Sequence, residues 1–174
     1  MTANKQTPVA SATGQISVET PYGVFIITAS GGKVCAISRA SEGDEQPVSL
    51  GATQPLLQLA AKELREYLAG ERMTFTFPMG AEGTPFQQKV WAAISQIPYG
   101  ETRTYGEIAQ VVENPKGSRA VGMACNRNPI MIAVPCHRVM GAGGKLTGYA
   151  YGTGLKHKLL SLEQREPKED TKKR

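Results

Sequence analysis

The chain has 174 residues, the length of one large domain or two small ones. With 40% hydrophobic and 20% charged residues it has the composition of a globular protein, which excludes overall disorder. The longest apolar run, residues 130–134, is far shorter than the roughly 20 residues that cross a bilayer, and the N-terminus lacks the apolar core of a signal peptide. We therefore expect a cytoplasmic protein with no membrane partner.

Positive charge is concentrated in the second half of the chain. Residues 1–80 hold 6 Lys and Arg against 7 Asp and Glu, whereas residues 81–174 hold 14 against 8. A basic half favours a polyanionic partner, with nucleic acid first and an anionic membrane surface second. A basic face on an ordinary soluble protein is the alternative.

The cysteines and histidines limit the chemistry that is open to the chain. Cys35, Cys125 and Cys136 cannot all pair, and none has the spacing of a metal site. This usage is typical of a reducing compartment with at least one free thiol. Because His137 and His157 are the only histidines, we expect neither a metal nor a cofactor.

The first half of the sequence predicts a small sheet and a helix. Alternating or β-branched segments separated by Gly-containing turns predict an antiparallel meander over residues 15–20, 24–29 and 33–38. The first dozen residues are expected to be loose, and the acidic residues 41–54 to be a loop. Pro55 then opens a helix that stops at Gly70, and residues 73–77 are predicted to form one more strand.

The second half predicts short helices after a change in composition at residues 80–83. We therefore expect domains over residues 1–80 and 81–174, and an α+β fold class. Capping-box patterns at Thr84 and Thr104 predict helix starts, and further helices are expected over residues 118–126 and 155–163. The two helices on either side of an Asn/Pro/Gly turn form a helix-turn-helix pattern, for which simple helical packing is the alternative reading.

The helix over residues 118–126 is predicted to have a core face and an open face. Residues suited to the core are Val121, Ala124 and Cys125. The opposite face combines hydrogen-bonding side chains with a glycine that lets another backbone approach closely: Arg119, Gly122, Met123 and Asn126. Nucleic acid fits this face, and so does an ordinary solvated surface.

A thiol beside an imidazole is the main candidate for chemistry. Cys136 is followed by His137 and Arg138, which offer a base and a positive charge that favour the nucleophilic thiolate. Since consecutive side chains of an extended chain point apart, the pair needs a turn or a bridging water. The alternative is a core cysteine beside a surface histidine.

Glu163 bears on that choice, because it lies in the apolar sector of the last predicted helix, where a carboxylate needs a partner. A histidine that must be held as a base, His137, is a fitting partner. Lys156 lies on the same sector and is a second candidate, while a helix-end glutamate that reaches water is the third reading. His157 points away and is expected at the surface.

These residues together resemble the O6-alkylguanine-DNA alkyltransferases, the methylated-DNA–protein-cysteine methyltransferases. The N-terminal part is similar in layout only, whereas residues 84–163 match in order and spacing. The matching blocks are residues 84–91, 97–109, 119–122 and 128–129, the signature Pro135-Cys136-His137-Arg138-Val139, residues 148–149, Gly152, Lys156, residues 159–160 and Glu163.

The resemblance implies a small ribonuclease-H-like α/β unit and a mainly helical domain with a winged helix-turn-helix motif that docks in the minor groove of double-stranded DNA. It implies a DNA repair protein that flips O6-alkylguanine, and also O4-alkylthymine, out of the duplex. The alkyl group then moves irreversibly to the protein's own cysteine, once per molecule. Clustering of molecules along the DNA is left open, as are the preferred alkyl group and the role of the N-terminal unit.

The resemblance also implies roles for individual residues. Cys136 would accept the alkyl group, His137 would act through a water as its base, and Glu163 would orient His137. Asn128 would be a structural hinge, and the Tyr105 hydroxyl would assist proton transfer. Arg119 would enter the base stack, and the other DNA contacts would come from Thr104, Ala120, Gly122, Met123 and Asn126. The substrate pocket would be lined by Tyr149, Tyr151 and Lys156.

Two departures from the family pattern lead to expectations of their own. The zinc ligands of some eukaryotic relatives have no counterpart here, and Tyr151 stands where several relatives carry Gly, which we expect to narrow the pocket. Competing functions are a cysteine hydrolase with multiple turnovers, a lesion-binding protein without transfer, and a helix-turn-helix regulator. The presence of Cys136 opposes the second, and the lack of an effector domain opposes the third.

Overall fold

A three-stranded antiparallel sheet opens the part of the chain that the computed structural model describes, residues 13–44 and 51–165. Its strands, in the order β1-β2-β3, are Gly14–Thr20, Gly23–Ser30 and Lys33–Arg39. Gly31 and Gly32 both have positive φ, which suits the tight turn between β2 and β3. The predicted meander is therefore confirmed.

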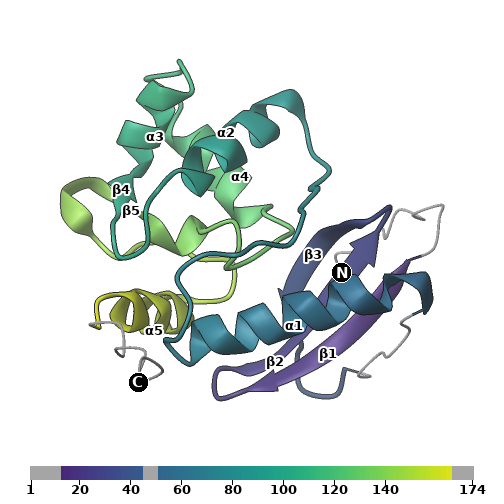
Figure 1. Ribbon diagram of the computed structural model, residues 1–174. Coiled ribbons are helices and arrows are strands. Elements are labelled where there is room, and N and C mark those ends of the chain that lie inside the picture. Colours follow the sequence, from purple (N-terminus) through teal and green to yellow (C-terminus); the bar gives the residue numbers. More distant parts are fainter. Residues whose placement is uncertain (1–12, 45–50, 166–174) are drawn as a thin grey trace, which may run out of the picture.

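Helix α1, Gln54–Leu68, lies across one face of this sheet (Figure 1). A short 3₁₀ turn, Gly51–Thr53, precedes it, and Gly70 with φ 76° ends it in the left-handed conformation that favours glycine. The helix is amphipathic, and its inner face is buried: Leu57, Ala60, Ala61, Leu64, Tyr67 and Leu68. Of the predicted loop over residues 41–54, residues 45–50 lie outside the described residues, as do the N-terminal residues 1–12 and the charged tail from residue 166.

The strand predicted over residues 73–77 is wrong. This segment has bends at Met73 and Phe77 and joins no sheet, and its middle is held by a side chain of α1. Glu63 of α1 accepts a hydrogen bond from the Thr76 backbone N–H at 2.8 Å and forms an ion pair with Arg72 at 3.5 Å. The β-forming Phe75 and Phe77 pack with their rings 5.4 Å apart rather than in a strand ladder.

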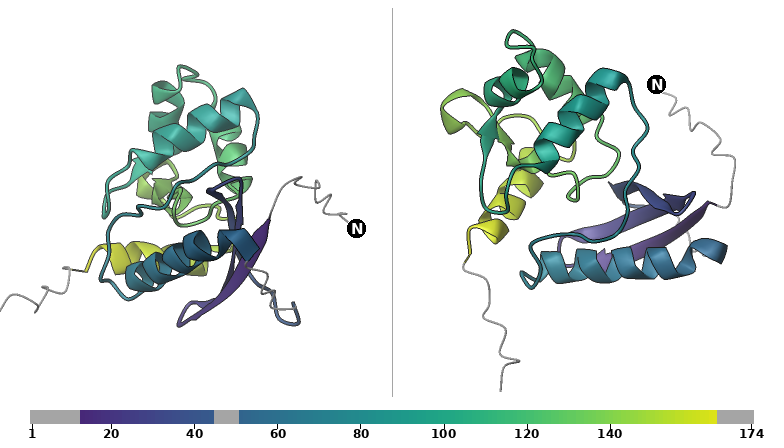
Figure 2. Two further views of the ribbon diagram at one scale, coloured as in Figure 1. Left: turned by 45° about the vertical axis from the view of Figure 1, so that its right-hand side comes forward. Right: turned by 45° about the horizontal axis from the view of Figure 1, so that its top comes forward.

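Three helices build the second part of the molecule: α2 Pro85–Ser95, α3 Tyr105–Val111 and α4 Ser118–Asn126. Thr84 and Thr104 form the predicted capping boxes, each accepting from the backbone three residues ahead while that residue's side chain bonds back. The Trp91 indole N–H donates to the Ala124 carbonyl at 2.9 Å and ties α2 to α4. Figure 2 shows these helices gathered above the sheet and α1.

The remaining elements lie between the helices and the sheet. A two-residue parallel pair joins β4 (Arg103–Thr104) to β5 (Val139–Met140). Short 3₁₀ turns cover Cys136–Arg138 and Ala142–Gly144, and α5 spans Thr153–Glu163. Helix α5 begins two residues earlier than predicted, after Gly152 at φ 91°. The α+β class is confirmed, and no helix of the described residues is long and apolar enough to cross a membrane.

The first sheet reaches into the second part of the chain through the edge of β3. The Ile37 N–H donates to the Pro129 carbonyl at 2.9 Å, and the Met131 N–H donates to the Ile37 carbonyl at 3.2 Å. These bonds form an isolated parallel bridge between Ile37 and Ile130. The sheet therefore holds the segment that leads to Cys136.

Candidate active site

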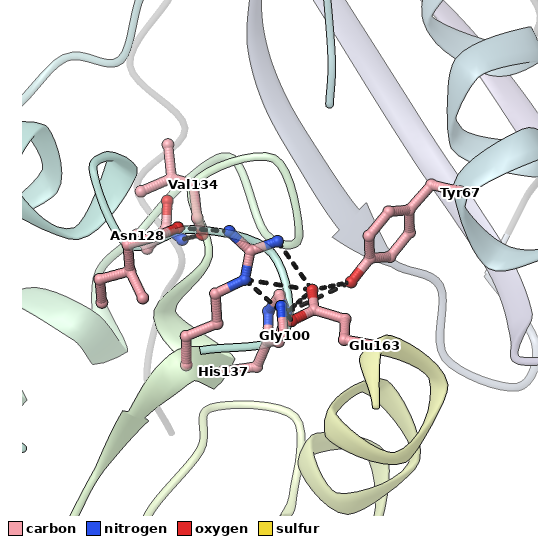
Figure 3. A network of polar contacts seen from close by, with 8 residues as sticks. Tyr67, Gly100, Asn128, Val134, His137 and Glu163 are labelled. Carbon is pink, nitrogen blue, oxygen red and sulfur yellow. Dashed lines mark hydrogen bonds and ion pairs between the residues drawn. The ribbon is translucent and has the colours of Figure 1, made fainter. Parts of the chain in front are cut away.

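Cys136 sits in a 3₁₀ turn at the end of a buried apolar segment. Its side chain is buried, with 4% of the residue exposed. The Asn128 amide donates to the Val134 carbonyl at 2.8 Å (Figure 3). It also donates to the Cys136 sulfur at 3.3 Å, while the Asn128 side-chain oxygen accepts from the Ile130 N–H at 2.9 Å. Asn128 thus ties the end of α4 to the thiol segment.

The segment between Asn128 and Cys136 carries backbone strain. Ile132 has φ 71°, a left-handed conformation that is unusual for a β-branched residue. Such a residue persists only where its surroundings over-determine it. Here the β3 edge holds residues 129–131 on one side and the Asn128 amide holds Val134 on the other.

His137 and Glu163 form a fully buried pair. His137 Nε2 lies 2.8 Å from Glu163 Oε1, and neither side chain is exposed. Since a carboxylate only accepts, we assign the proton to Nε2, which leaves Nδ1 with its lone pair. Nδ1 is buried, and the described residues give it no hydrogen-bond partner. Burial lowers the pKa of His137 although Glu163 acts in the other direction, so the imidazole is neutral near pH 7 and able to act as a base.

Glu163 is the centre of the network in Figure 3. Besides His137, its carboxylate accepts from Arg138 in a two-pronged contact, with Nε to Oε2 at 2.9 Å and Nη2 to Oε1 at 2.8 Å, and from the Tyr67 hydroxyl. The Gly100 N–H donates to Oε2 at 3.3 Å. Burial alone would raise the pKa of Glu163, but the hydrogen bonds from His137 and Arg138 prevail and lower it to about 2.

Lys156 does not pair with Glu163, so that alternative from the sequence is wrong. Its ammonium group is buried and donates to the backbone carbonyls of Val139, Thr147 and Gly148, the last two at 2.9 and 3.2 Å. It also lies 5.8 Å from the centre of the Tyr105 ring. Arg138, with its planar fork, supplies the positive charge on Glu163 instead.

The resting sulfur is a thiol rather than a thiolate. The neighbouring Cys125 thiol and burial raise the pKa of Cys136 well above its ordinary value, and the opposing effects of Asn128 and Lys156 are smaller. The prediction that Arg138 favours the thiolate is wrong for the resting protein, because its guanidinium faces Glu163. The proton must therefore leave Cys136 as the reaction proceeds.

The open face of α4 is as predicted. Arg119, Met123 and Asn126 are exposed, whereas Val121, Ala124 and Cys125 are buried. Beside this face lies a cavity of about 500 Å³ with Arg119, Gly122 and Asn126 from α4 in its wall. Ala120 and Met123 do not line it. Its other lining residues are Thr104, Tyr105, Gly106, Ser118, Ala142, Thr147 and Gly148.

Two tyrosines, Tyr105 and Tyr149, stand near the Cys136 thiol, and Tyr151 packs against the second of them. Burial raises the pKa of Tyr105 to about 12, with further contributions from Cys125 and Cys136, and its hydroxyl lies 3.5 Å from the Thr147 and Gly148 carbonyls. Burial also raises the pKa of Tyr149, and the charge of a Cys136 thiolate would raise it further. The Tyr149 and Tyr151 rings meet edge-on at 5.9 Å. Tyr151 also lines a second cavity of about 690 Å³ against residues 39–44.

Three partners of Glu163 were not predicted from the sequence: the side chains of Tyr67 and Arg138 and the backbone N–H of Gly100. Tyr67 lies on the inner face of α1, where a buried hydroxyl needs a partner, and this was the available signal. Arg138 was noted only as a nearby charge. His157 is exposed, as predicted. Among the described residues no group of three His, Cys, Asp or Glu side chains could hold a metal ion.

Comparison with known proteins gives the same family for both parts of the chain. Residues 16–81 match the family model "6-O-methylguanine DNA methyltransferase, ribonuclease-like domain", and residues 85–165 match the model of the DNA binding domain of the same family. The expected ribonuclease-like unit is therefore confirmed.

Individual relatives agree with these matches. A methylated-DNA–protein-cysteine methyltransferase of Methanosarcina acetivorans is 49% identical over 147 residues, which are 83% of this chain and 94% of that protein. The constitutive enzyme of Bacillus subtilis is 53% identical over 116 residues, or 66% and 70% of the two chains. The crystal structure of Mycobacterium tuberculosis OGT in complex with DNA superposes with a TM-score of 0.76 at 42% identity, covering 86% of this chain and 92% of that one.

Proposed function

The chain belongs to the 6-O-methylguanine DNA methyltransferase family, and from this premise we propose that the sulfur of Cys136 accepts the alkyl group from damaged DNA. Its activity is that of a methylated-DNA–protein-cysteine methyltransferase, which repairs DNA by alkyl transfer to cysteine. The observation that supports the assignment is that Cys136 is followed by the buried pair of His137 and Glu163, in which His137 Nδ1 has no hydrogen-bond partner among the described residues.

The reaction is a displacement at the alkyl carbon. The Cys136 sulfur forms a bond to that carbon while the bond from the carbon to guanine O6 breaks. The thiol proton passes through a water to His137 Nδ1, and Glu163 stabilises the imidazolium that forms. The guanine leaves as an anion or takes a proton from the Tyr105 hydroxyl, which later regains it. The high pKa of the resting thiol keeps Cys136 protonated until the substrate is bound and His137 takes the proton.

Access to the lesion requires that the base leave the duplex, because an O6-alkyl group is hidden in the stack. We propose that α4 enters the minor groove, where the small Ala120 and Gly122 permit close approach and Thr104, Met123 and Asn126 add contacts. Arg119 fills the gap in the stack. The cavity beside α4 and the tyrosines Tyr105, Tyr149 and Tyr151 receive the extruded nucleotide.

Each molecule reacts once, because the thioether formed on Cys136 has no carbonyl for water to attack. The test is incubation of the protein with an excess of duplex that contains O6-methylguanine. Transfer should reach a plateau at one methyl group per chain. A parallel experiment with an O4-methylthymine duplex should reach the same plateau, at a rate no higher than that for O6-methylguanine. Continued turnover beyond one equivalent would instead support a cysteine hydrolase.

Arg119→Ala is expected to slow alkyl transfer about tenfold while DNA affinity changes by less than about threefold, because extrusion of a base costs a few kcal/mol and Arg119 offsets part of it. Single-turnover transfer rates and fluorescence anisotropy with the same duplex measure the two quantities. Arg127→Ala is the charge-matched control, since Arg127 is exposed at the other end of α4. Equal losses of binding and transfer in Arg119→Ala would contradict the intercalating role.

Tyr151→Gly is expected to accelerate inactivation by O6-benzylguanine at least about fivefold, because it removes a ring that packs against Tyr149 and narrows the pocket. Tyr151→Phe keeps the ring and should behave like the natural protein. The loss of free Cys136 thiol over time measures the rate. Equal rates for the Gly variant and the natural protein would contradict the claim that Tyr151 narrows the substrate pocket.

A further inference from the structure

Tyr67 connects the N-terminal unit to the His137–Glu163 pair. It lies on α1, far from the pair in sequence, and its side chain is fully buried. Its hydroxyl donates to Glu163 Oε1, and its oxygen lies 3.3 Å from His137 Nε2. Figure 3 shows the ring reaching across to the carboxylate at the end of α5.

The geometry around Tyr67 forms a closed triangle of donors and acceptors. His137 Nε2–H points to Glu163 Oε1 at 2.8 Å and also has the Tyr67 oxygen in reach. The Tyr67 hydrogen is directed at the same Oε1. Every polar atom of the triangle is therefore used in one arrangement only, with the proton on Nε2 and the lone pair on Nδ1.

The Tyr67 ring is held in place by its own unit and by the segment after α2. Its centroid lies 5.3 Å from the Phe75 ring and 6.0 Å from Tyr99, which meets it edge-on. Tyr99 in turn lies under the Arg138 guanidinium at 5.7 Å. Since α1 packs on the sheet, the position of the Tyr67 hydroxyl is set by the fold of the N-terminal unit.

We propose that Tyr67 is a positioning residue through which the N-terminal unit holds Glu163 and His137 in the arrangement that leaves His137 Nδ1 free to take the Cys136 proton. This inference rests on the proposed function. It gives the N-terminal unit a part in the chemistry, in addition to any contribution to stability.

Arg138 alone would not produce this arrangement. Its two-pronged contact aligns the carboxylate with the guanidinium plane and engages both oxygens. The Tyr67 hydroxyl donates a further hydrogen bond to Oε1 and thereby reduces the negative charge on that oxygen. Glu163 then stabilises the protonated form of His137 less strongly. Without the hydroxyl, Glu163 should stabilise the protonated His137 more strongly.

The other groups that face His137 act in known directions. Arg138 from its own turn and Lys156 from α5 both disfavour the imidazolium, whereas Glu163 favours it. Tyr99 lies beside Tyr67 and Arg138. Of these groups, only Glu163 is a hydrogen-bond partner of the Tyr67 hydroxyl, so a shift in the titration of His137 in Tyr67→Phe reports on the change at Glu163.

The test is Tyr67→Phe, with the pH dependence of single-turnover methyl transfer as the first readout. We expect the rate to fall about fivefold at its plateau and the acidic limb of the profile to move upward by about half a pH unit or more. DNA affinity should stay within about twofold. Tyr22→Phe is the matched control, because it removes a hydroxyl of the same unit that acts on the neighbouring Tyr99 and bonds to neither Glu163 nor His137, and it should leave both quantities unchanged.

A second readout does not need alkyl transfer. The chain has two histidines, so ¹⁵N NMR of selectively labelled protein resolves His137, with the exposed His157 as an internal reference. In Tyr67→Phe the signals of His137 should lose the pure Nε2–H pattern, or its titration should move upward, while those of His157 stay unchanged. Thermal unfolding of the variant confirms that it is folded under the conditions used.

A double variant separates positioning from packing. If Tyr67 acts through Glu163, its removal should have little further effect in a Glu163→Gln background. An unchanged pH profile and unchanged His137 signals in Tyr67→Phe would overturn the proposal, as would an equal effect in the Gln background. Failure of the natural protein to transfer methyl groups would overturn the proposed function instead, and the NMR titration would still decide the contact between Tyr67 and the pair.

Discussion

Glu163→Ala is expected to destabilise the protein by about 3–5 kcal/mol, because it leaves a buried guanidinium without its carboxylate. The Arg138 side chain is 9% exposed, and without Glu163 it would keep only its existing hydrogen bond to the Ile97 carbonyl at 2.7 Å. His137 and Tyr67 lose the same acceptor. Chemical denaturation at pH 7 measures the loss, which should be among the largest of any single substitution in this chain.

Glu163→Gln is the control, since it keeps the shape of the side chain while it removes the charge and replaces one accepting oxygen with a donating NH2 group. Its destabilisation should depend on pH in a definite direction. The pKa of Glu163 is lowered from 4.5 to about 2 in the folded protein, so its contribution is complete above about pH 4.5 and is lost as the pH falls toward 2. The stability gap between the natural protein and Glu163→Gln should therefore shrink over that interval. A gap that is constant down to pH 2, or a Glu163→Ala variant within about 1 kcal/mol of the natural protein, would contradict the network.

Cys136→Ser is expected to abolish methyl transfer and to leave DNA binding within about twofold of the natural protein. The alcohol is a far weaker nucleophile than the thiolate, and His137 is not basic enough to form the alkoxide. Because Cys136 is buried and lies outside the wall of the cavity beside α4, the DNA-facing surface should not change.

The matched control for that substitution is Cys35→Ser. Cys35 is half-buried in β3, where its thiol lies 3.5 Å from the Thr28 carbonyl, far from the described network. It should transfer methyl groups at the natural rate. Residual transfer by Cys136→Ser, or a loss of transfer in Cys35→Ser, would show that the acceptor has been misassigned.

Local signals predicted most of the secondary structure, because each depends on residues close in sequence. Thr84 and Thr104 cap their helices through the residues three positions ahead, and the glycines between β2 and β3 fix a tight turn. The strand expected over residues 73–77 does not form, because the Thr76 N–H is bonded to Glu63 and the rings of Phe75 and Phe77 pack against each other. Such long-range substitutes leave no local pattern.

The site residues, too, could be predicted where the signal is local and not where it depends on distant segments. The position of Glu163 in an apolar sector predicted a buried partner, and the structure brings His137 to it. Spacing offered Lys156 as a partner and not Arg138, because the cation that reaches Glu163 depends on how the turn Cys136–Arg138 meets α5. Lys156 is directed to backbone carbonyls, and Tyr67 arrives from a unit about 70 residues away in the chain.

The central claim is that the Cys136 sulfur takes the alkyl carbon, and peptide mapping tests it most directly. The natural protein is incubated under reducing conditions with a duplex that contains one O6-methylguanine, digested, and measured by mass spectrometry. The account predicts one added methyl group per chain, carried by the peptide that contains Cys136, with Cys35 and Cys125 unmodified. A methyl group on either of those cysteines, or none on Cys136 after the protein has met the lesion, would contradict it.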